Sequence, residues 1–366
     1  MWPITVKEFL ELRRDRRSVA MMLLMPLVFL VVFGYAASFD VKEVSTVVVG
    51  PQANAAKGML PEPLTVKDVE PSEDRDWAVD QIRNGKETAA VVTYSSSEQK
   101  PELLVDGSNL FAAQAVEGMI AGAAQSGQSA ASNVKVEILF NPDLSTPPIM
   151  IPGLVGVVLV IAGTIATALG VVRERQSGTL EQLAVMPFSA GDVLLGKIAP
   201  YLMLACVELV VVTVAGIYIF NVPFVGSLAA YALGSLLFLI VTLGLGLFIS
   251  TVSQTQGQAI QLAMMTMVPQ ILLSGFIFPL NAIVPAVRWI SYLLPLTYFV
   301  PISRGIWVRG ASIQSLWFEY VMLAAFAVVL FVVSVLRFRR DLAVDSARKK
   351  QPATAGAEPA AEGEAA

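Results

Sequence analysis

Glu174-Arg-Gln-Ser-Gly-Thr-Leu-Glu-Gln-Leu183 is a short polar stretch that directly follows a long apolar run, Ile149 to Val172. Another apolar run begins after Lys197. Both runs reach the length of about 20 residues that a helix needs to cross the hydrocarbon core of a bilayer. A segment this short and this polar between two membrane spans is more typical of a docking surface than of a passive linker.

The composition indicates that the chain is a membrane protein. Of its 366 residues 55% are hydrophobic and only 15% are charged, whereas about 25% are charged in a typical soluble domain. The chain has no histidine, which excludes histidine-based catalytic triads, histidine metal sites and histidine pH switches. Its single cysteine, Cys206, lies in an apolar run and is interpreted as a small buried residue, so no disulfide staples the soluble part.

The apolar runs predict six membrane spans. They cover roughly Val19–Ala37, Ile149–Val172, Ile198–Phe220, Gly226–Ile249, Ala259–Phe278 and Leu316–Leu336. Pro26 and Pro269 lie inside the first and fifth spans, where each removes a backbone donor and is expected to bend its helix. The first run is too long for the apolar core of a cleavable signal and lacks a clear small-residue cleavage site.

The distribution of arginine and lysine predicts the orientation of these spans. Basic residues cluster before the first span, around the segment 173–197 and after the sixth span. The positive-inside rule places all three regions on the cytosolic side, so both termini are expected in the cytosol. Arg288, Arg304 and Arg309 fall on the opposite side and oppose this assignment.

Residues 1–37 are predicted to contain an interfacial helix and the first span. The segment from Trp2 to Arg17 mixes apolar and basic residues, which favours a helix at the lipid headgroups over an ordinary basic flank. Residues 38–147 form the one large soluble region and are expected outside the cytosol as an α/β domain. Its predicted strands are Val44–Gly50, Leu64–Val69, Thr88–Tyr94, Glu102–Asp106 and Val134–Phe140, and its predicted helices are Asp74–Asn84 and Leu110–Ala124.

Residues 148–340 are predicted to form a bundle of five spans, with the segment 173–197 as a loop between the first two of them. The segment 281–310 is apolar but is interrupted by three prolines, so no piece of it is long enough to span the membrane. It predicts short helices that dip into the outer leaflet, with Trp289 and Trp307 at the interface.

Residues 341–366 are rich in alanine, glutamate, proline and glycine and are predicted to be a disordered cytosolic tail.

One apparent nucleotide motif is rejected. Gly191 to Lys197 fits the spacing G-x-x-x-x-G-K, but a P-loop requires Ser or Thr next and a strand before it. Ile198 follows here, and Lys197 is interpreted as a membrane-edge anchor. If ATP drives this protein, another chain binds it.

Glu208 lies near the middle of the third predicted span, where a carboxylate is costly unless it is paired, protonated or facing a cavity. Two interpretations stay open: a polar group in a substrate path or dimer interface, or a neutral acid hydrogen-bonded to a neighbouring helix. A proton-coupled secondary transporter that uses Glu208 is therefore an alternative function, and a non-transporting membrane anchor is another. The polar turn Ser250–Gln258 is interpreted as a helix-capping loop.

In their joint order these features resemble the permease subunit of a type-2 ABC exporter, in the subgroup with a large extracytosolic domain between the first two spans. The resemblance covers nearly the whole chain, is weakest over 39–139 and is absent from the tail. The motifs that carry it are Lys7-Glu8-Phe9 with Arg13-Arg14-Asp15 and Pro26, Asn141-Pro142 with Pro152-Gly153, the stretch from Glu174 to Leu183 with Pro187 and Gly196-Lys197, Phe220-Asn-Val-Pro223 with Gly226-Ser227, Ile249-Ser250-Thr251, Leu273-Ser-Gly-Phe-Ile-Phe-Pro279, Pro295-Leu-Thr-Tyr298 and Arg304-Gly305.

The resemblance implies an α-helical polytopic membrane fold of six helices in the bacterial cytoplasmic membrane and ATP-driven export of a hydrophobic or amphipathic substrate such as a drug or lipid. It implies that the surface contacting the ATPase contains Glu174, Arg175, Gly178, Thr179, Glu181, Gln182 and Leu183. Candidates for the translocation path or dimer interface are Glu208, Met264, Pro269 and Ser274. No cofactor is expected on this chain, because ATP-Mg would bind the partner ATPase. The other expected partners are a second permease copy or a sister permease and membrane lipids, with a periplasmic adaptor as a further candidate and no nucleic acid.

Overall fold

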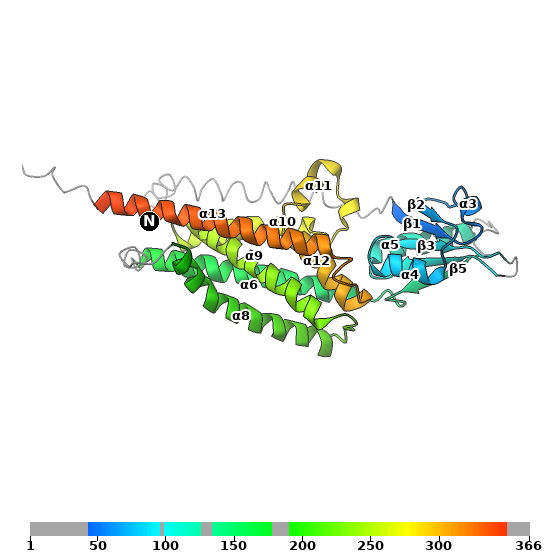
Figure 1. The fold of residues 1–366 in the computed structure, drawn as a ribbon, viewed down its shortest axis with the longest axis horizontal. Coiled ribbons are helices and arrows are strands. Elements are labelled where there is room, and N and C mark those ends of the chain that lie inside the picture. The colour runs from blue at the N-terminus through cyan, green and yellow to red at the C-terminus, as the bar shows by residue number, and fades with distance from the viewer. Residues whose placement is uncertain (1–42, 96–98, 126–133, 178–189, 350–366) are drawn as a thin grey trace, which may run out of the picture.

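The computed structural model describes residues 43–95, 99–125, 134–177 and 190–349. The molecule is elongated, with a bundle of long helices at one end and a small α/β domain at the other (Figure 1). The predicted interfacial helix and the first predicted span, Val19–Ala37, lie outside the described residues.

The α/β domain is built on a five-stranded sheet in the order β2-β1-β3-β4-β5. Its strands are β1 (Val44–Val49), β2 (Leu64–Glu70), β3 (Ala89–Val92), β4 (Glu102–Asp106) and β5 (Lys135–Leu139). β1 pairs in parallel with β2 and β3, β4 runs antiparallel to β3, and β5 runs parallel to β4. The five predicted strands are confirmed, with ends that differ by at most two residues.

Helices cover both faces of this sheet, because its central strands are apolar on both sides. Successive side chains of a strand point to opposite faces, so Val48 packs on the side of α5 (Leu110–Gln125) and Val49 on the side of α4 (Arg75–Arg83). A short helix, α3 (Ala53–Ala56), follows β1. Both predicted helices are confirmed, and Asp74 caps α4 by accepting a hydrogen bond from the backbone N–H of Trp77 at 3.0 Å.

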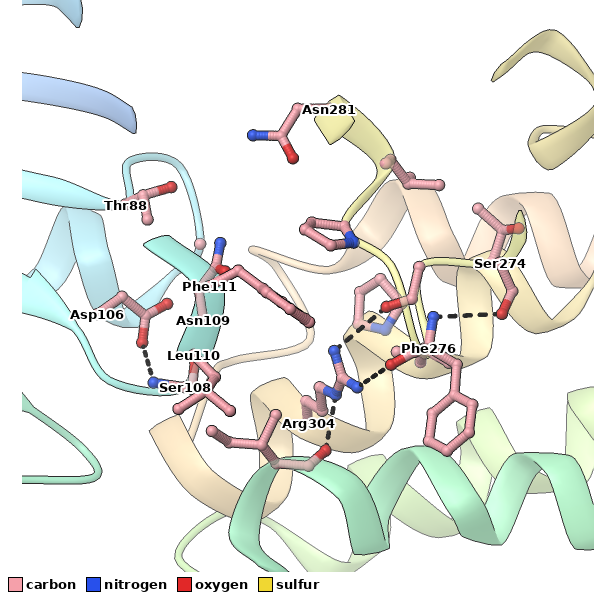
Figure 2. Close-up of a pocket in the computed structure, with 18 of the residues that line it drawn as sticks. Thr88, Asp106, Ser108, Asn109, Leu110, Phe111, Ser274, Phe276, Asn281 and Arg304 are labelled. Carbon is pink, nitrogen blue, oxygen red and sulfur yellow. Dashed lines mark hydrogen bonds between the residues drawn. The ribbon is translucent and has the colours of Figure 1, made fainter. Parts of the chain in front are cut away.

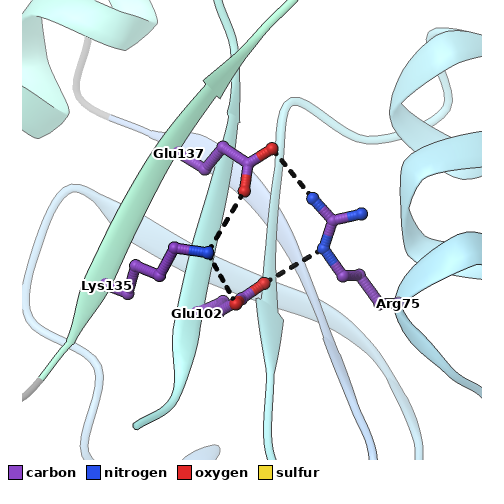
Figure 3. A network of polar contacts seen from close by, with 4 residues as sticks. All are labelled: Arg75, Glu102, Lys135 and Glu137. Atoms are coloured by element: carbon purple, nitrogen blue, oxygen red, sulfur yellow. Dashed lines mark hydrogen bonds and ion pairs between the residues drawn. The ribbon is translucent and has the colours of Figure 1, made fainter.

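A network of four charged residues ties the start of α4 to the β4–β5 edge of the sheet (Figure 3). Arg75 donates to Glu102 (Nε to Oε2, 3.0 Å) and to Glu137 (Nη2 to Oε1, 2.8 Å), and Nζ of Lys135 lies 2.9 Å and 3.6 Å from the same two carboxylates. Burial raises the pKa of Glu102, but the hydrogen bonds from Lys135 and Arg75 outweigh it, so this pKa lies below its ordinary value. The network is therefore strongest where Glu102 is ionised.

Four helices among the described residues are long and apolar enough to cross a bilayer, which confirms a polytopic membrane fold. They are α6 (Pro147–Gln176), the part Ile198–Tyr218 of α8 (Ala190–Tyr218), α9 (Leu228–Val252) and the part Trp317–Arg337 of α13 (Trp317–Lys349). A further helix, α10 (Gln256–Leu273), lies at the predicted fifth span, but it is 18 residues long and contains four glutamines, and it is not among the four. The total of six spans stays a prediction.

α6 occupies the centre of the bundle, where it packs against α8, α9 and α10. Small residues let α6 and α9 approach closely. A Cβ on Gly246 would lie 2.5 Å from the carbonyl oxygen of Thr164, and a Cβ on Gly163 would lie 2.9 Å from Oγ1 of Thr242. Oγ1 of Thr164 also donates to the carbonyl oxygen of Thr242 at 3.3 Å. Small residues and hydrogen bonds across helices are the usual basis of tight helix packing in membranes.

Short helices occupy the segment predicted to contain them. They are η2 (Leu280–Ala282), α11 (Pro285–Ser291), α12 (Leu296–Arg304) and η3 (Gly305–Arg309), the last a π-helical turn. Trp289 is exposed, as expected of an interfacial aromatic residue. The prediction for Trp307 is wrong: it is fully buried, because the rings of Phe224 and Tyr231 enclose it at centroid distances of 5.5 Å and 5.7 Å.

The predicted tail begins inside the last helix. Residues 341–349 continue α13 as far as Lys349, so the prediction of disorder for them is wrong. Their leucine, alanine, arginine and lysine residues have high helix propensity, and an existing helix extends more easily than a new one nucleates. Residues 350–366 lie outside the described residues.

Candidate coupling surface and translocation helices

The polar stretch Glu174–Leu183 begins on a helix rather than in a loop. α6 continues beyond its apolar part, so that Glu174 and Arg175 belong to its last turn. The predicted start of the loop at residue 173 is therefore wrong. Basic residues in a last turn are favoured by the negative end of the helix dipole, which explains the extension. The other predicted coupling residues lie outside the described residues: Gly178, Thr179, Glu181, Gln182 and Leu183.

α8 begins at Ala190, inside the segment predicted as a loop, while its part that is long and apolar enough to cross a membrane begins at Ile198, the predicted start of that span. The connection between the two helices is thus limited to 177–189. The stretch from Gly191 to Lys197 lies on α8, and a P-loop requires a loop after a strand. Its helical backbone agrees with its rejection as a nucleotide motif.

The last turn of α6 is tied to the turn between α9 and α10. Nη1 of Arg175 donates to the backbone carbonyl oxygens of Ser250 (3.2 Å) and Ser253 (3.0 Å). Beside it, Nε2 of Gln256 donates to Oε1 of Gln176 at 3.0 Å. The carbonyls at the end of a helix lack donors within that helix, and a cation there also interacts favourably with the helix dipole. These contacts connect the α6 tip directly to the end of α9 and the start of α10.

The α9–α10 turn is held by hydrogen bonds of its own. Oγ1 of Thr255 accepts from the backbone N–H of Gln258 at 3.2 Å, and Oε1 of Gln258 accepts from the backbone N–H of Gln254 at 3.0 Å. These two bonds satisfy the N–H of Gln258, in the first turn of α10, and the N–H of Gln254, just before the N-cap residue Thr255. The interpretation of Ser250–Gln258 as a capping loop is confirmed for its central part, while its first residues belong to α9 and its last ones to α10.

Glu208 lies on α8, a helix at the edge of the bundle (Figure 1). Many apolar side chains of α8 are exposed, among them Leu204 and Val207. Glu208 itself is half-buried, and none of the described residues contributes a hydrogen bond or ion pair to its carboxylate. An unpaired carboxylate in a membrane span is costly. The part of the chain that the structure describes supplies no neighbouring-helix partner for it.

The other three candidates for the path or interface lie on or beside α10. Met264 is exposed, Pro269 is half-buried within the helix, and Ser274 is buried just beyond the helix end. α6 packs against both α8 and α10 and lies between them, so Glu208 is separated from these residues. The four candidates do not form one cluster within a single chain.

The sequence patterns missed a charged contact where the α/β domain meets the short helices. Arg309 lies at the end of η3 and Asp106 at the end of β4. Nη1 of Arg309 pairs with Oδ2 of Asp106 at 3.1 Å, and both side chains are largely buried. Oδ1 of the same carboxylate accepts the backbone N–H of Ser108 at 2.9 Å. Gly85 allows the guanidinium to approach, because a Cβ there would lie 3.0 Å from Nη2 of Arg309.

Arg304, at the end of α12, is held by three backbone carbonyl oxygens (Figure 2). Nε donates to Ile149 at 2.9 Å, Nη1 to Gly275 at 3.3 Å and Nη2 to Phe276 at 2.7 Å. Arg288 similarly donates to backbone carbonyls of its own segment. All three arginines that oppose the predicted orientation are thus engaged in contacts within the protein. Their position was the one sequence signal that could have indicated this junction.

Comparison with known proteins adds the family context of this geometry. The model of the family described as ABC-2 family transporter protein matches residues 16–336. The probable multidrug ABC transporter permease YbhS of Escherichia coli K12 is 29% identical over 363 residues, which cover 93% of this chain and 96% of that protein. The probable multidrug ABC transporter permease YbhR of the same strain is 26% identical over 341 residues, covering 87% and 92%. ABC transporter G family member 20 of Dictyostelium discoideum is 27% identical over 198 residues, covering 54% of this chain and 27% of that protein.

Proposed function

This chain belongs to the ABC-2 family of transporter proteins, as a permease subunit of an ATP-driven exporter whose ATPase is a separate chain, and we propose that it exports hydrophobic or amphipathic small molecules. Two similar proteins are named probable multidrug ABC transporter permeases and align over almost their whole length. The apolar character of the bundle suits such a substrate.

In the proposed mechanism the ATPase docks on the tip of α6 and on the segment 178–183 that follows it. The observation that carries this proposal is the contact of Arg175 with the carbonyls of Ser250 and Ser253. Closure of the ATPases on ATP moves the α6 tip, and the guanidinium passes that movement to α9 and α10. Packed helices respond to such a displacement as rigid elements that shift between discrete arrangements. The bundle thereby changes the side on which its substrate path is open.

The coupling proposal is tested with Glu174→Ala and Glu181→Lys in the reconstituted complex of permease and ATPase. We expect both variants to fold normally, because Glu174 lies half-buried in the last turn of α6 and not in the packed core, and substitutions outside such a core usually change stability by about 0.5 kcal/mol or less. We expect weaker ATPase binding and less transport per ATP, because Glu174→Ala removes a charged contact and Glu181→Lys introduces a charge that repels its partner across the interface. Glu117→Ala, an exposed change on α5 of the α/β domain, is the matched control. Normal transport by both variants would remove this segment from the mechanism.

The proposed orientation places the α6 tip in the cytosol and the α/β domain outside, because the two lie at opposite ends of α6 (Figure 1). Met59 is 80% exposed on the domain, so Met59→Cys in a Cys206→Ala background provides a single accessible thiol. A membrane-impermeant maleimide should label it in intact cells. Labelling only after permeabilisation would reverse the orientation.

A complete transporter in this proposal contains two permease chains, either two copies of this chain or this chain and a sister permease. Glu208 supports a role of α8 at the interface or along the path, because its half-buried carboxylate receives no partner from the described residues. A second permease chain would supply the missing polar contact and would bury part of the exposed apolar surface of α8.

A further inference from the structure

A cavity of about 740 Å³ lies between the α/β domain and the short helices (Figure 2). Thr88 and Asn109 line it from the domain, and Phe276, Ile277 and Leu280 line it from the helical part. Its volume lies within the range of about 300–1,000 Å³ that is typical of small-molecule sites. Polar and apolar side chains from both parts of the chain therefore line a space large enough for a ligand.

The cavity carries an excess of positive charge. Its ionisable acidic and basic side chains are Lys67, Arg304 and Arg309 on the positive side and Glu87 and Asp106 on the negative side. Asp106 is already paired with Arg309, at 3.1 Å. No carboxylate among the described residues pairs with Arg304, whose partners are backbone carbonyl oxygens. Among the described residues, Arg304 is therefore held by backbone carbonyl oxygens and forms no ion pair, although Asp106 attracts its charge at longer range and Oε2 of Glu87 is buried in the same lining without a hydrogen-bond partner.

Hydrogen-bond donors remain available at this charge. A guanidinium has five N–H groups, and the three backbone carbonyls occupy only three of those of Arg304. Nε of Arg309 is buried without any partner in the described part of the chain. A buried donor without a partner costs free energy, and an enclosed cation gains most from an anion that accepts its hydrogen bonds. The remaining N–H groups of Arg304 point to an anionic ligand group, and the unpartnered Nε of Arg309 adds to the positive charge beside them.

An apolar surface adjoins these donors. The ring of Phe276 lies 6.0 Å from Cζ of Arg304, measured to the ring centroid. Ile277 and Leu280 are half-buried and continue this wall. A ligand that satisfies the whole site must therefore combine an anionic group with an apolar part.

We propose that this cavity binds an amphiphile whose phosphate or carboxylate group faces the guanidinium of Arg304, and whose apolar part lies on Ile277 and Leu280. Two sources can supply this chemistry, a resident membrane lipid or an exported molecule. Binding itself does not depend on export. Only the identification of the amphiphile as cargo rests on the proposed function.

The test measures binding of two probes to the delipidated full-length chain in neutral detergent. Lysophosphatidic acid provides the phosphate, and the monoacylglycerol with the same acyl chain lacks it. We expect the phosphate probe to bind at least about tenfold more tightly, the effect of one charge-assisted hydrogen bond. Equal affinities of the two probes would overturn the proposal.

Variants locate the binding in the cavity. Oδ1 of Asn109 accepts the backbone N–H of Ala112 at 3.3 Å, and Asn109→Asp preserves this acceptor while adding a negative charge to the cavity wall. We expect Asn109→Asp to weaken the binding of lysophosphatidic acid about tenfold. Arg304→Gln should weaken this binding further. Arg288→Gln is the control, because Arg288 is also held by backbone carbonyls but does not line the cavity. Unchanged affinity in Asn109→Asp would overturn the proposal, whether or not Arg304→Gln folds.

The same Asn109→Asp variant distinguishes the two sources. In vesicles with the partner ATPase, a parallel loss of lysophosphatidic acid binding and of its ATP-driven transport supports a site on the export route. Loss of binding and of co-purified phospholipid, with transport unchanged, supports a resident lipid. Absence of ATP-driven transport by the unmodified chain would contradict the proposed function and would leave the binding result standing.

Discussion

Replacing Arg175 by alanine should loosen the tip of α6 from the α9–α10 turn and uncouple ATP hydrolysis from transport. One atom, Nη1, serves the carbonyls of Ser250 and Ser253 at 3.2 Å and 3.0 Å, and the side chain is half-buried. A hydrogen bond with one charged partner contributes about 1.5–3 kcal/mol net. Because Nη1 of Arg175 is shared between two carbonyls and the side chain is only half-buried, we assign this contact the lower value of about 1.5 kcal/mol. The interaction of the cation with the end of α9 adds about 0.5 kcal/mol. The total of about 2 kcal/mol corresponds to about thirtyfold in the equilibrium between a tied and a separated tip.

The assay compares transport with ATP hydrolysis in vesicles that contain the permease and its ATPase. Arg175→Ala should retain ATP hydrolysis, while its transport per ATP falls severalfold. Arg175→Lys should show transport per ATP between that of Arg175→Ala and that of the parent, since lysine keeps the charge but lacks the guanidinium geometry. Arg173→Ala is the matched control, because Arg173 is exposed in the same helical turn and loses the same charge. Equal losses in Arg173→Ala and Arg175→Ala, or normal coupling in Arg175→Ala, would refute the reasoning.

Gly246→Ala should lower the free energy of unfolding of the purified permease by about 1–3 kcal/mol through overpacking between α6 and α9, whereas Gly244→Ala, whose Cβ would meet only the side chain of Leu330 at 3.3 Å, should change it little; equal effects would contradict this. Glu208→Gln should retain export with ATP supplied and the proton gradient collapsed, because an amide preserves hydrogen bonding; activity of the parent that vanishes with the gradient but persists without ATP would indicate proton coupling. Because the folded-state pKa of Glu102 lies below its ordinary value, its stabilisation is present at neutral pH and is lost as pH falls through that pKa. Glu102→Gln should therefore lower the hydrogen-exchange protection of the α/β domain at neutral pH but much less in acid, and a pH-independent difference would contradict this.

Local patterns in the sequence were sufficient for most of the architecture. Strand β4 was predicted with its observed ends, Glu102 and Asp106, because its apolar run is bounded by a proline and a glycine. The spans at α6 and α9 were evident from length and apolarity, and the short helices between η2 and η3 from their prolines. These signals are readable because backbone geometry and hydrophobic burial act over a few neighbouring residues.

Element ends were less predictable. The polar residues Arg173 to Gln176 indicated the end of a membrane span, but the end of the span is not the end of the helix. A helix that leaves the membrane can continue in water, where polar side chains are solvated and its existing hydrogen-bond ladder extends it. The same reasoning applies to the start of α8 and the end of α13.

The contacts that position the candidate sites were decided only by the tertiary structure. Arg175 meets carbonyls 75 and 78 residues further along the chain, and Arg309 meets Asp106 across 203 residues. The sequence alone placed these arginines in or near apolar segments. It also showed that their charges need hydrogen-bond or ion-pair partners there. Which partner each one finds depends on how the helices and the α/β domain pack together, because hydrogen bonds and ion pairs act over a few ångströms in space and carry no signature in sequence separation.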